Sequence, residues 1–243
     1  MRSTVLPFAF VLALRAQSSD FTEQLPSAAD VVAKMTELDD QRQAALRDYT
    51  AERRYVLENA HHHKRAEMLV KVSCLGDGSK QFETVSETGW GAARSHVFPR
   101  LLESESEASR PDIRERSRIT PGNYSFQMLG KESINERPAY VIAIAPKTEN
   151  KYLIRGRIWV DLEDYAIVRI EGEPAKNPSF WIKSVHFVHN YAKNGPIWLP
   201  VSDRSVTDAR FIGSTELTIE YYAFSPNTAA LSALYPPASR GPR

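Results

Sequence analysis

Residues 152–172, which read YLIRGRIWVDLEDYAIVRIEG, constrain the fold of this chain more than any other stretch. Two runs rich in branched and aromatic residues flank the acidic break DLED at 161–164, which is the pattern of a β-hairpin. Strand side chains alternate, so the two apolar sets share a face only if the loop holds an odd number of residues. We therefore expect a loop of three or five residues. The apolar face would carry Ile154, Ile158, Val160, Ala166, Val168 and Ile170, and the charged face Arg155, Arg157, Trp159, Tyr165, Arg169 and Glu171.

Composition excludes two broad classes of protein. A hydrophobic fraction of 42% with 10% aromatic residues is typical of a folded globular protein rather than a disordered one. A formal net charge of +1, with basic and acidic residues interleaved, offers no electrostatic footprint for nucleic acid. The 243 residues suffice to bury a core, and the single cysteine, Cys74, rules out an intramolecular disulfide.

The N-terminus has the organisation of a secretory signal peptide. Arg2 precedes an apolar run at 5–14, which is as long as a signal-peptide core and too short to span a bilayer. The residues AQS then offer small side chains for cleavage before Ser19. We expect residues 1–18 to be removed and the mature protein to be soluble, periplasmic and without an N-terminal lipid anchor, since no cysteine follows the apolar run. A buried N-terminal segment is the alternative, because Arg15 makes the signal atypical.

A helix and a long series of strands follow. Residues 27–46 place apolar side chains at helical spacing, and Ser27 or Asp30 can cap the first turn. Strand patterns joined mainly by short turns then recur at 49–58, 67–74, 81–88, 123–129, 139–145, 180–191, 197–206 and 215–222, besides the hairpin. This predicts one domain over residues 19–224: a curved antiparallel sheet or incomplete β-barrel of about eleven strands, with the amphipathic helix packed against it. Residues 225–243, rich in Pro, Ala and Ser, are expected to form a disordered tail.

Residues 99–118 interrupt the strand pattern. A short helix can open at Pro99 and Leu101, but its body reads SESEAS and four arginines follow in 110–118. We expect a surface segment in the middle of the fold that is a candidate for a mobile lid. A solvated connecting loop is the alternative.

No catalytic or metal-binding motif stands out in the sequence. Residues 61–63 are three histidines in a predicted turn, where consecutive side chains do not converge on one ion. His186 and His189 are three apart in a predicted strand and so lie on opposite faces, one of them as a hydrogen-bonded core histidine. The acidic residues 161–164 lack the glycine and the ligand number of a calcium loop, so a hairpin turn is their expected use. We expect no enzymatic activity, no metal and no cofactor, with a hydrolase built from these carboxylates and strand histidines as the minor alternative.

In its organisation the chain resembles the bacterial outer-membrane lipoprotein-sorting family, with the LolA/LolB-like fold. The resemblance lies in the export signal, the leading helix at 27–46, and the hairpin of 156–161 (GRIWVD) and 165–171 that follows the strand at 140–146. It implies a half-barrel of about eleven strands, plugged by helices, around a hydrophobic cavity. Family members of the carrier type ferry lipoprotein acyl chains across the periplasm, and related domains act as envelope-stress sensors. The lid-locking arginine of the family is not assigned to any position in this sequence.

These observations predict a non-catalytic periplasmic carrier or binding protein that holds a lipid or lipoprotein acyl chain without a cofactor. Each buried methylene would contribute ~0.8 kcal/mol. The cavity wall would consist of Met68, Val70, Val72, Tyr140, Ile142, Ile144, Ile158, Val168, Ile170, Leu217 and Ile219, unless these residues pack a dry core beneath the helix. The alternative is a cell-envelope sensor or assembly module, with a protein-binding face of Arg155, Arg157, Trp159 and Arg169.

Overall fold

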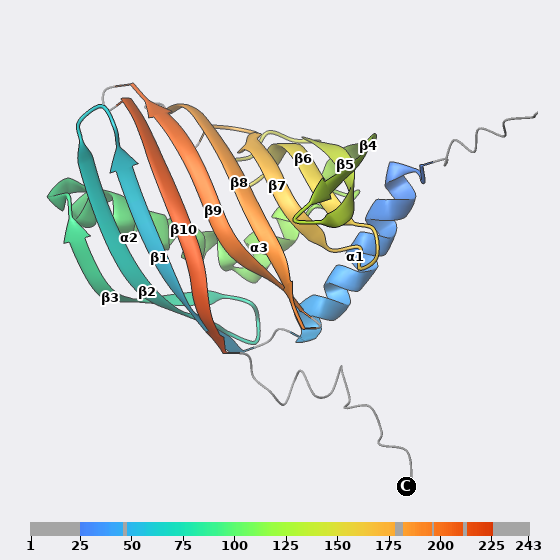
Figure 1. Cartoon of the computed structure of the whole chain (residues 1–243), viewed down its shortest axis with the longest axis horizontal. Helices are drawn as coiled ribbons and strands as arrows, with labels where there is room; N and C mark the ends of the chain where they lie inside the picture. The colour runs from blue at the N-terminus through green and yellow to red at the C-terminus, as the bar shows by residue number, and fades with distance from the viewer. Residues whose placement is uncertain (1–24, 46–47, 178–181, 196, 211–212, 226–243) are drawn as a thin grey trace, which may run out of the picture.

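The computed structural model describes residues 25–45, 48–177, 182–195, 197–210 and 213–225. Within these ranges ten antiparallel strands form one curved sheet (Figure 1). The strands are β1 (Tyr49–Asn59), β2 (Lys64–Cys74), β3 (Lys80–Gly89), β4 (Tyr124–Ile134), β5 (Arg137–Pro146), β6 (Ile154–Asp161), β7 (Ile167–Pro174), β8 (Ile182–Asn194), β9 (Ile197–Ala209) and β10 (Gly213–Ser225). The predicted curved antiparallel sheet is confirmed, with ten strands in place of about eleven.

Two predictions concern segments that the structure does not describe. The signal peptide at 1–18 lies outside the described residues, and so does the predicted tail except for Ser225, which ends β10. In the described part of the chain, no helix combines the length and the apolar character needed to cross a membrane.

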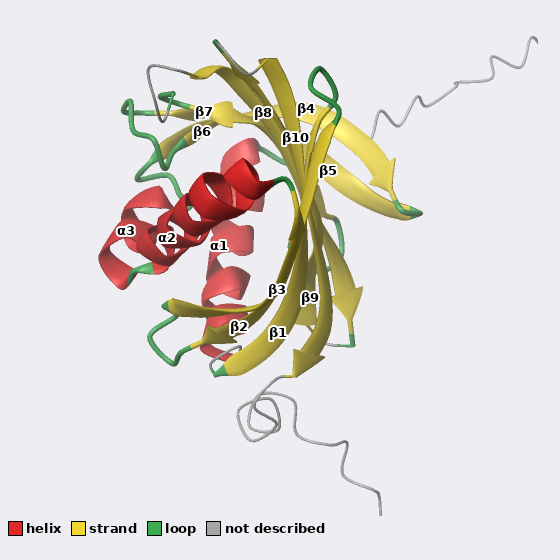
Figure 2. Cartoon of the chain, turned by 90° about the vertical axis from the view of Figure 1, so that its left-hand side faces the viewer, coloured by secondary structure: helices red, strands yellow, loops and turns green. Residues whose placement is uncertain are grey.

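The edge strands of the sheet are consecutive in the chain. The strand order is β3-β2-β1-β10-β9-β8-β7-β6-β5-β4, so the connection from β3 to β4 runs from one edge to the other. This connection holds the π-helical turn η1 (Ala93–Val97), α2 (Phe98–Ser109) and α3 (Pro111–Ser117). Figure 2 shows these helices and α1 (Ala28–Ala45) on the same side of the sheet, inside its curve. We call this side the inner face, and residues 93–118, which include the C-cap Arg118 of α3, the helical cover.

The helix predicted at 27–46 is confirmed as α1, and its start is capped as expected. The backbone N–H of Asp30 donates to Ser27 Oγ at 3.1 Å, and the Ser27 hydroxyl donates to the Asp30 carboxylate at 2.7 Å. Val31, Val32 and Met35 are buried on the sheet-facing side. They join the first apolar cluster, which also holds Leu153 just before β6 and whose members on the strands are Tyr124, Tyr140, Ile142, Ile144, Ile158, Val160, Ile170 and Phe187.

The helical cover packs on a second apolar cluster near the other end of the sheet. Phe98 is fully buried, and Leu101 and Leu102 pack beside it at helical spacing. Below them lie Tyr55, Leu57, Ala66, Met68, Val70, Val72 and Ile219 of β1, β2 and β10. The short helix predicted to open at Pro99 is confirmed as α2, and residues 99–118 form helices in place of the solvated connecting loop given as the alternative. All of these residues except Ser109 are at least partly exposed, so the segment lies at the surface, and its role as a mobile lid stays a prediction. Phe98, Leu101 and Leu102 pack one face of α2 against the second apolar cluster. The other residues of this helix do not enter that cluster.

The hairpin of β6 and β7 has the odd loop that the sequence predicts, with five residues at 162–166. Ile158 pairs with Ile170, and both enter the first apolar cluster. Tyr165, predicted on the charged face, lies in this loop and packs against the same cluster. The apolar faces of the two strands therefore coincide at their centre.

A β-bulge near the loop changes the face of one predicted residue. Trp159 pairs with Arg169, whereas the next residue, Val160, pairs with Ile167, which leaves Val168 as the extra residue. Val168 packs with Trp159, Ala139 and Val141 in a third cluster, separate from the one that holds Val160. The prediction that Val168 shares a face with Ile170 is wrong, because the bulge interrupts the strict alternation.

Candidate binding site on the inner face of the sheet

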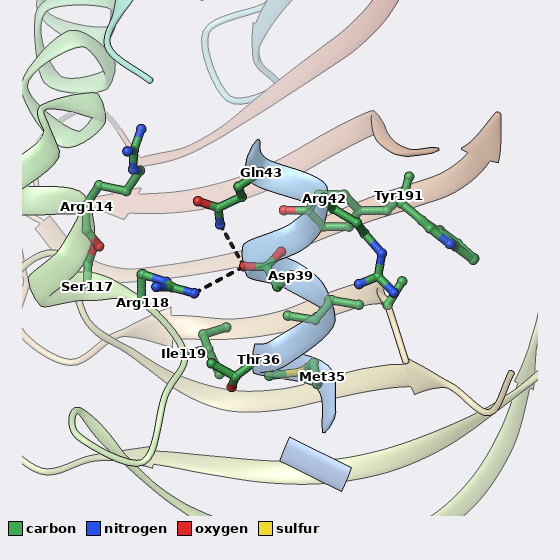
Figure 3. Close-up of a pocket in the computed structure, with 13 residues that line it drawn as sticks. Met35, Thr36, Asp39, Arg42, Gln43, Arg114, Ser117, Arg118, Ile119 and Tyr191 are labelled. Carbon is green, nitrogen blue, oxygen red and sulfur yellow. Dashed lines mark hydrogen bonds and ion pairs between the residues drawn. The ribbon is translucent and has the colours of Figure 1, made fainter. Parts of the chain in front are cut away.

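Two adjoining cavities remain between α1, the helical cover and the inner face, and a third is lined by β1, β8, β9 and β10. The first, of about 370 Å³, has a partly apolar lining that includes Met35, Ile119, Ile167 and Trp198 (Figure 3). The second, of about 510 Å³, adjoins it, since Gln43, Arg114 and Arg118 line both. The third, of about 250 Å³, shares Tyr49 with the second. The first two cavities fall in the size range of small-molecule sites, roughly 300–1,000 Å³.

Charged groups of α1 and the helical cover meet at the first cavity. Figure 3 shows Gln43 and Arg118 directed at Asp39, with Gln43 Nε2 2.7 Å and Arg118 Nη2 3.6 Å from its carboxylate. Arg118 also pairs with Asp40. Burial raises the pKa of the Asp39 carboxyl, and the nearby Arg118 guanidinium opposes that shift. These contacts attach the end of the helical cover to α1 by polar groups.

A buried arginine joins the sheet to the helical cover. The Arg53 side chain is 3% exposed, and its Nη1 lies 2.7 Å from Oε2 of Glu105 on α2. The Tyr55 hydroxyl donates to the other oxygen of Glu105 at 3.0 Å. Arg53 Nε has no hydrogen-bond partner among the described residues. Since an unpaired buried cation would be costly, Glu105 anchors α2 at this position.

The same arginine continues into a polar row across the inner face. Its guanidinium carbon lies 4.6 Å from the centre of the Tyr221 ring, and the Tyr221 hydroxyl donates to Asp203. Asp203 in turn pairs with His189 Nδ1 at 2.7 Å. Burial raises the pKa of Tyr221, and the Asp203 carboxylate adds to the shift, so this hydroxyl stays a proton donor. The row lies across β1, β10, β9 and β8, so the apolar clusters do not form one continuous wall.

The predicted wall residues divide between the clusters described above. Five lie in the first cluster beneath α1, namely Tyr140, Ile142, Ile144, Ile158 and Ile170. Met68, Val70, Val72 and Ile219 lie in the second beneath the helical cover, with Leu217 packed against it. Val168 is in the third cluster. None of these side chains is among those lining the three described cavities, so their contact with a ligand stays a prediction.

The predicted protein-binding face has a buried centre. Trp159 is 2% exposed and donates from Nε1 to Glu132 at 2.8 Å. The guanidinium carbons of Arg157 and Arg169 each lie 5.1 Å from the Trp159 ring. The expectation of Trp159 as an open contact residue is wrong, because the two arginines and the neighbouring strands cover it. Binding of a partner by Arg155, Arg157 and Arg169 stays a prediction.

The acidic turn holds a structural ion pair. Asp161 is 1% exposed and accepts from Nε of Arg137 at 2.7 Å and from its Nη2 at 2.9 Å. It also accepts from the backbone N–H groups of Glu163 and Asp164 at 3.0 and 2.8 Å. Although burial opposes it, these hydrogen bonds hold the pKa of the Asp161 carboxyl below its usual range. The hairpin-turn assignment of these acidic residues is confirmed.

The histidines also take the positions predicted for them. His61, His62 and His63 lie in the turn between β1 and β2. His186 lies 3.8 Å from Glu171 and is 60% exposed, whereas His189 packs beside the buried Phe187. The two strand histidines are thus on opposite faces. His189 has a carboxylate partner in Asp203, but neither residue lines the three cavities.

Three charged residues of the site, Arg53, Glu105 and Lys80, were not predicted from the sequence. A signal for the first was present, since Arg53 shares a strand face with Tyr55 and Leu57, which are apolar or aromatic. An arginine on that face must find a partner in the interior. Its partner comes from α2, 52 residues away in the chain, and no local pattern identifies it.

The central part of this chain is similar to a described domain family. Residues 64–172, from β2 to β7, match the family model of the MucB/RseB N-terminal domain. A search of curated proteins finds no match.

Solved structures that are similar to this chain match it at low sequence identity. A LolA superfamily protein from Nitrosomonas europaea is 11% identical with a TM-score of 0.41, over 83% of this chain and 94% of that one. An outer-membrane lipoprotein-sorting domain from Vibrio parahaemolyticus is 16% identical with a TM-score of 0.43, over 81% and 94%. The lipoprotein LppX from Mycobacterium tuberculosis is 11% identical with a TM-score of 0.29, over 82% and 96%. Residues 64–172 are thus similar to the MucB/RseB N-terminal domain. Proteins named for the LolA superfamily and for outer-membrane lipoprotein sorting, the family that the sequence resembles, are among the solved structures similar to this chain.

Proposed function

We propose that this protein is a non-catalytic periplasmic carrier or binding protein, which holds a lipid or lipoprotein acyl chain between the inner face and the helices. The observation that carries the proposal is the pair of adjoining, solvent-open cavities, of about 370 and 510 Å³, that are lined by α1, the helical cover and residues of the sheet. Met35, Ile119 and Ile167 offer the first cavity apolar surface for methylene groups. Burial of each methylene would contribute ~0.8 kcal/mol to binding.

The attachment of the helical cover suits a site that enlarges when a long chain enters. Polar contacts tie it to the rest of the protein: Glu105 to Arg53, Arg114 to the carbonyl of Asp77, and Arg118 to α1. Its apolar contacts come mainly from Phe98, Leu101 and Leu102. An acyl chain can replace such contacts, because they are non-directional. In this proposal the cover moves outward, and the second apolar cluster becomes the wall for the distal part of the chain.

Uptake of a fluorescent fatty acid by lipid-free protein tests the function directly. We expect saturable uptake by the full chain, and organic extraction of freshly purified protein should release lipid. The variant Thr36→Leu adds bulk to the first cavity and should weaken uptake, whereas Glu37→Leu adds bulk on the exposed side of α1 and should not. A folded, lipid-free protein without fatty-acid uptake would contradict the proposal.

An envelope interaction module is the second candidate. It is favoured by the arginines of the hairpin: Arg155 and Arg157 are 55% and 45% exposed. Replacing both with alanine should then abolish binding of a protein partner and leave fatty-acid uptake intact. Loss of neither activity would show that these arginines are only solvated.

A further inference from the structure

Lys80 stands at the start of β3 with its side chain on the inner face. It pairs with the buried Cys74 of β2, and Phe82, two residues further along β3, packs on the second apolar cluster. The backbone is held by α2, because the Lys80 N–H donates to Ser109 Oγ at 2.9 Å and the Ser106 hydroxyl donates to the Lys80 carbonyl at 3.4 Å. The position of this lysine is therefore determined by both the sheet and the helical cover.

The Lys80 ammonium has no ion-pair or hydrogen-bond partner among the residues that the structure describes. Two carboxylates of the inner face, Glu105 and Asp203, act on it electrostatically, but each is already engaged, the first by Arg53 and the second by His189 and Tyr221. Burial lowers the pKa of Lys80, and the charge of Arg53 adds to that shift. Lys80 is partly buried at the cavity wall, and a partly buried cation without a counter-charge is a marker of a functional site.

A second cation, Arg114 of α3, lines the same cavity as Lys80. Its Nη2 donates to the backbone carbonyl of Asp77 at 2.9 Å, and it has no carboxylate partner among the described residues. The guanidinium lies directly on the turn before β3, since a Cβ at Gly78 would fall 1.4 Å from Arg114 Nη1. Gly78 also has a φ of 84°, which favours glycine.

The carboxylates that line this cavity are committed elsewhere. Asp40 and Glu115 pair with Arg118, and the Asp77 carboxylate accepts from the backbone and hydroxyl of Ser79 at 2.8 and 2.6 Å. The cavity thus presents two cations that form no ion pair with a carboxylate of the described residues. It continues into the first cavity, where the lining becomes apolar at Met35, Ile119 and Ile167.

We propose that Lys80 and Arg114 form a headgroup subsite for an anionic amphiphile, binding its carboxylate or phosphate while the acyl chain extends into the first cavity. The inference rests on the proposed carrier function and specifies the class of lipid. The anion of the ligand supplies the counter-charge for Lys80, which forms no ion pair with a described residue of the inner face. A neutral lipid of the same chain length binds less tightly, because it leaves the ammonium desolvated and unpaired.

Calorimetry on the full, delipidated chain tests this subsite with four probes: dodecanoate, dodecyl phosphate, dodecanol and inorganic phosphate. We expect dodecanoate or dodecyl phosphate to bind at least about tenfold more tightly than dodecanol, the ratio that one charge-assisted hydrogen bond supplies. The variants Lys80→Met and Arg114→Gln should each remove most of that ratio and leave dodecanol binding unchanged. The matched controls are Lys71→Met on β2, which faces solvent, and Arg116→Gln on α3, which is exposed.

The outcomes separate the subsite from the carrier function. Equal binding of the anionic and neutral probes, or an anionic preference that survives Lys80→Met, overturns the subsite and leaves the carrier intact. No binding of any twelve-carbon probe overturns the carrier. Binding of inorganic phosphate alone, lost in Lys80→Met, overturns the amphiphile in favour of a small anion. A melting temperature of Lys80→Met no lower than that of the wild type shows that the variant is folded.

Discussion

Arg53 of β1 and Glu105 of α2 form an ion pair with an Nη1–Oε2 distance of 2.7 Å, and the arginine side chain is 3% exposed. This contact joins two elements that are far apart in the chain. It places a charge between the sheet and the helical cover, where apolar packing alone would not specify the position of α2. Breaking it should therefore affect both the stability and the attachment of the cover.

Replacing Glu105 with alanine should lower the free energy of unfolding by about 3 kcal/mol, because Arg53 is left buried without its carboxylate. The double variant Arg53→Met, Glu105→Leu should recover most of that loss, since neither charge remains. Urea denaturation of the single and double variants measures the coupling. Additive losses in the double variant would show that the two side chains do not stabilise one another.

Replacing Lys80 with methionine should raise the free energy of unfolding at neutral pH, because the variant no longer holds a partly buried, unpaired ammonium. Burial lowers the pKa of Lys80, so the charged side chain lowers the free energy of unfolding by its full amount at pH values below that lowered pKa. This effect disappears as the pH rises through the ordinary lysine value of about 10.4. The advantage of the variant in urea denaturation should shrink toward that pH. A destabilised variant at neutral pH would identify Lys80 as a structural residue.

Replacing Asp161 with asparagine should cost about 2 kcal/mol at pH 7, because the charged side chain accepts several hydrogen bonds. The pKa of this carboxyl is lowered in the folded protein, so its contribution is present above the ordinary value of about 3.9 and is lost as the pH falls through the lowered pKa. Denaturation curves of the variant and the wild type should converge in acid. Glu163→Gln in the same turn, 79% exposed, should change stability by less than about 1 kcal/mol. Equal effects of the two substitutions would contradict the role of Asp161.

Replacing Trp159 with alanine should lower the free energy of unfolding by about 3 kcal/mol, as expected for a large buried side chain. The cost arises because the cluster with Val141 and Val168 loses its largest member. Thermal melting of this variant measures the cost. Arg155→Ala, on the same strand but exposed, should leave the melting temperature nearly unchanged. If Trp159→Ala melts at the same temperature as the wild type, the ring does not stabilise the fold.

Features that depend on residues close in the chain could be predicted from the sequence. The five-residue loop of the hairpin follows from strand alternation, and the start of α1 follows from Ser27 and Asp30. The acidic residues after β6 form a turn for the same local reason. The sequence alone therefore determined the class of fold, the leading helix and the family resemblance.

Tertiary structure decided which charged residues are enclosed. Arg53 and Lys80 resemble ordinary strand cations in the sequence, and their environment arises only when α2 and α3 cross the inner face. The bulge that moves Val168 from the inner face to the third cluster depends on pairing between strands. The position of residues 99–118 depends on the apolar face of β1 and β2. Burial and electrostatic complementarity involve elements distant in sequence, and a local pattern carries no record of them.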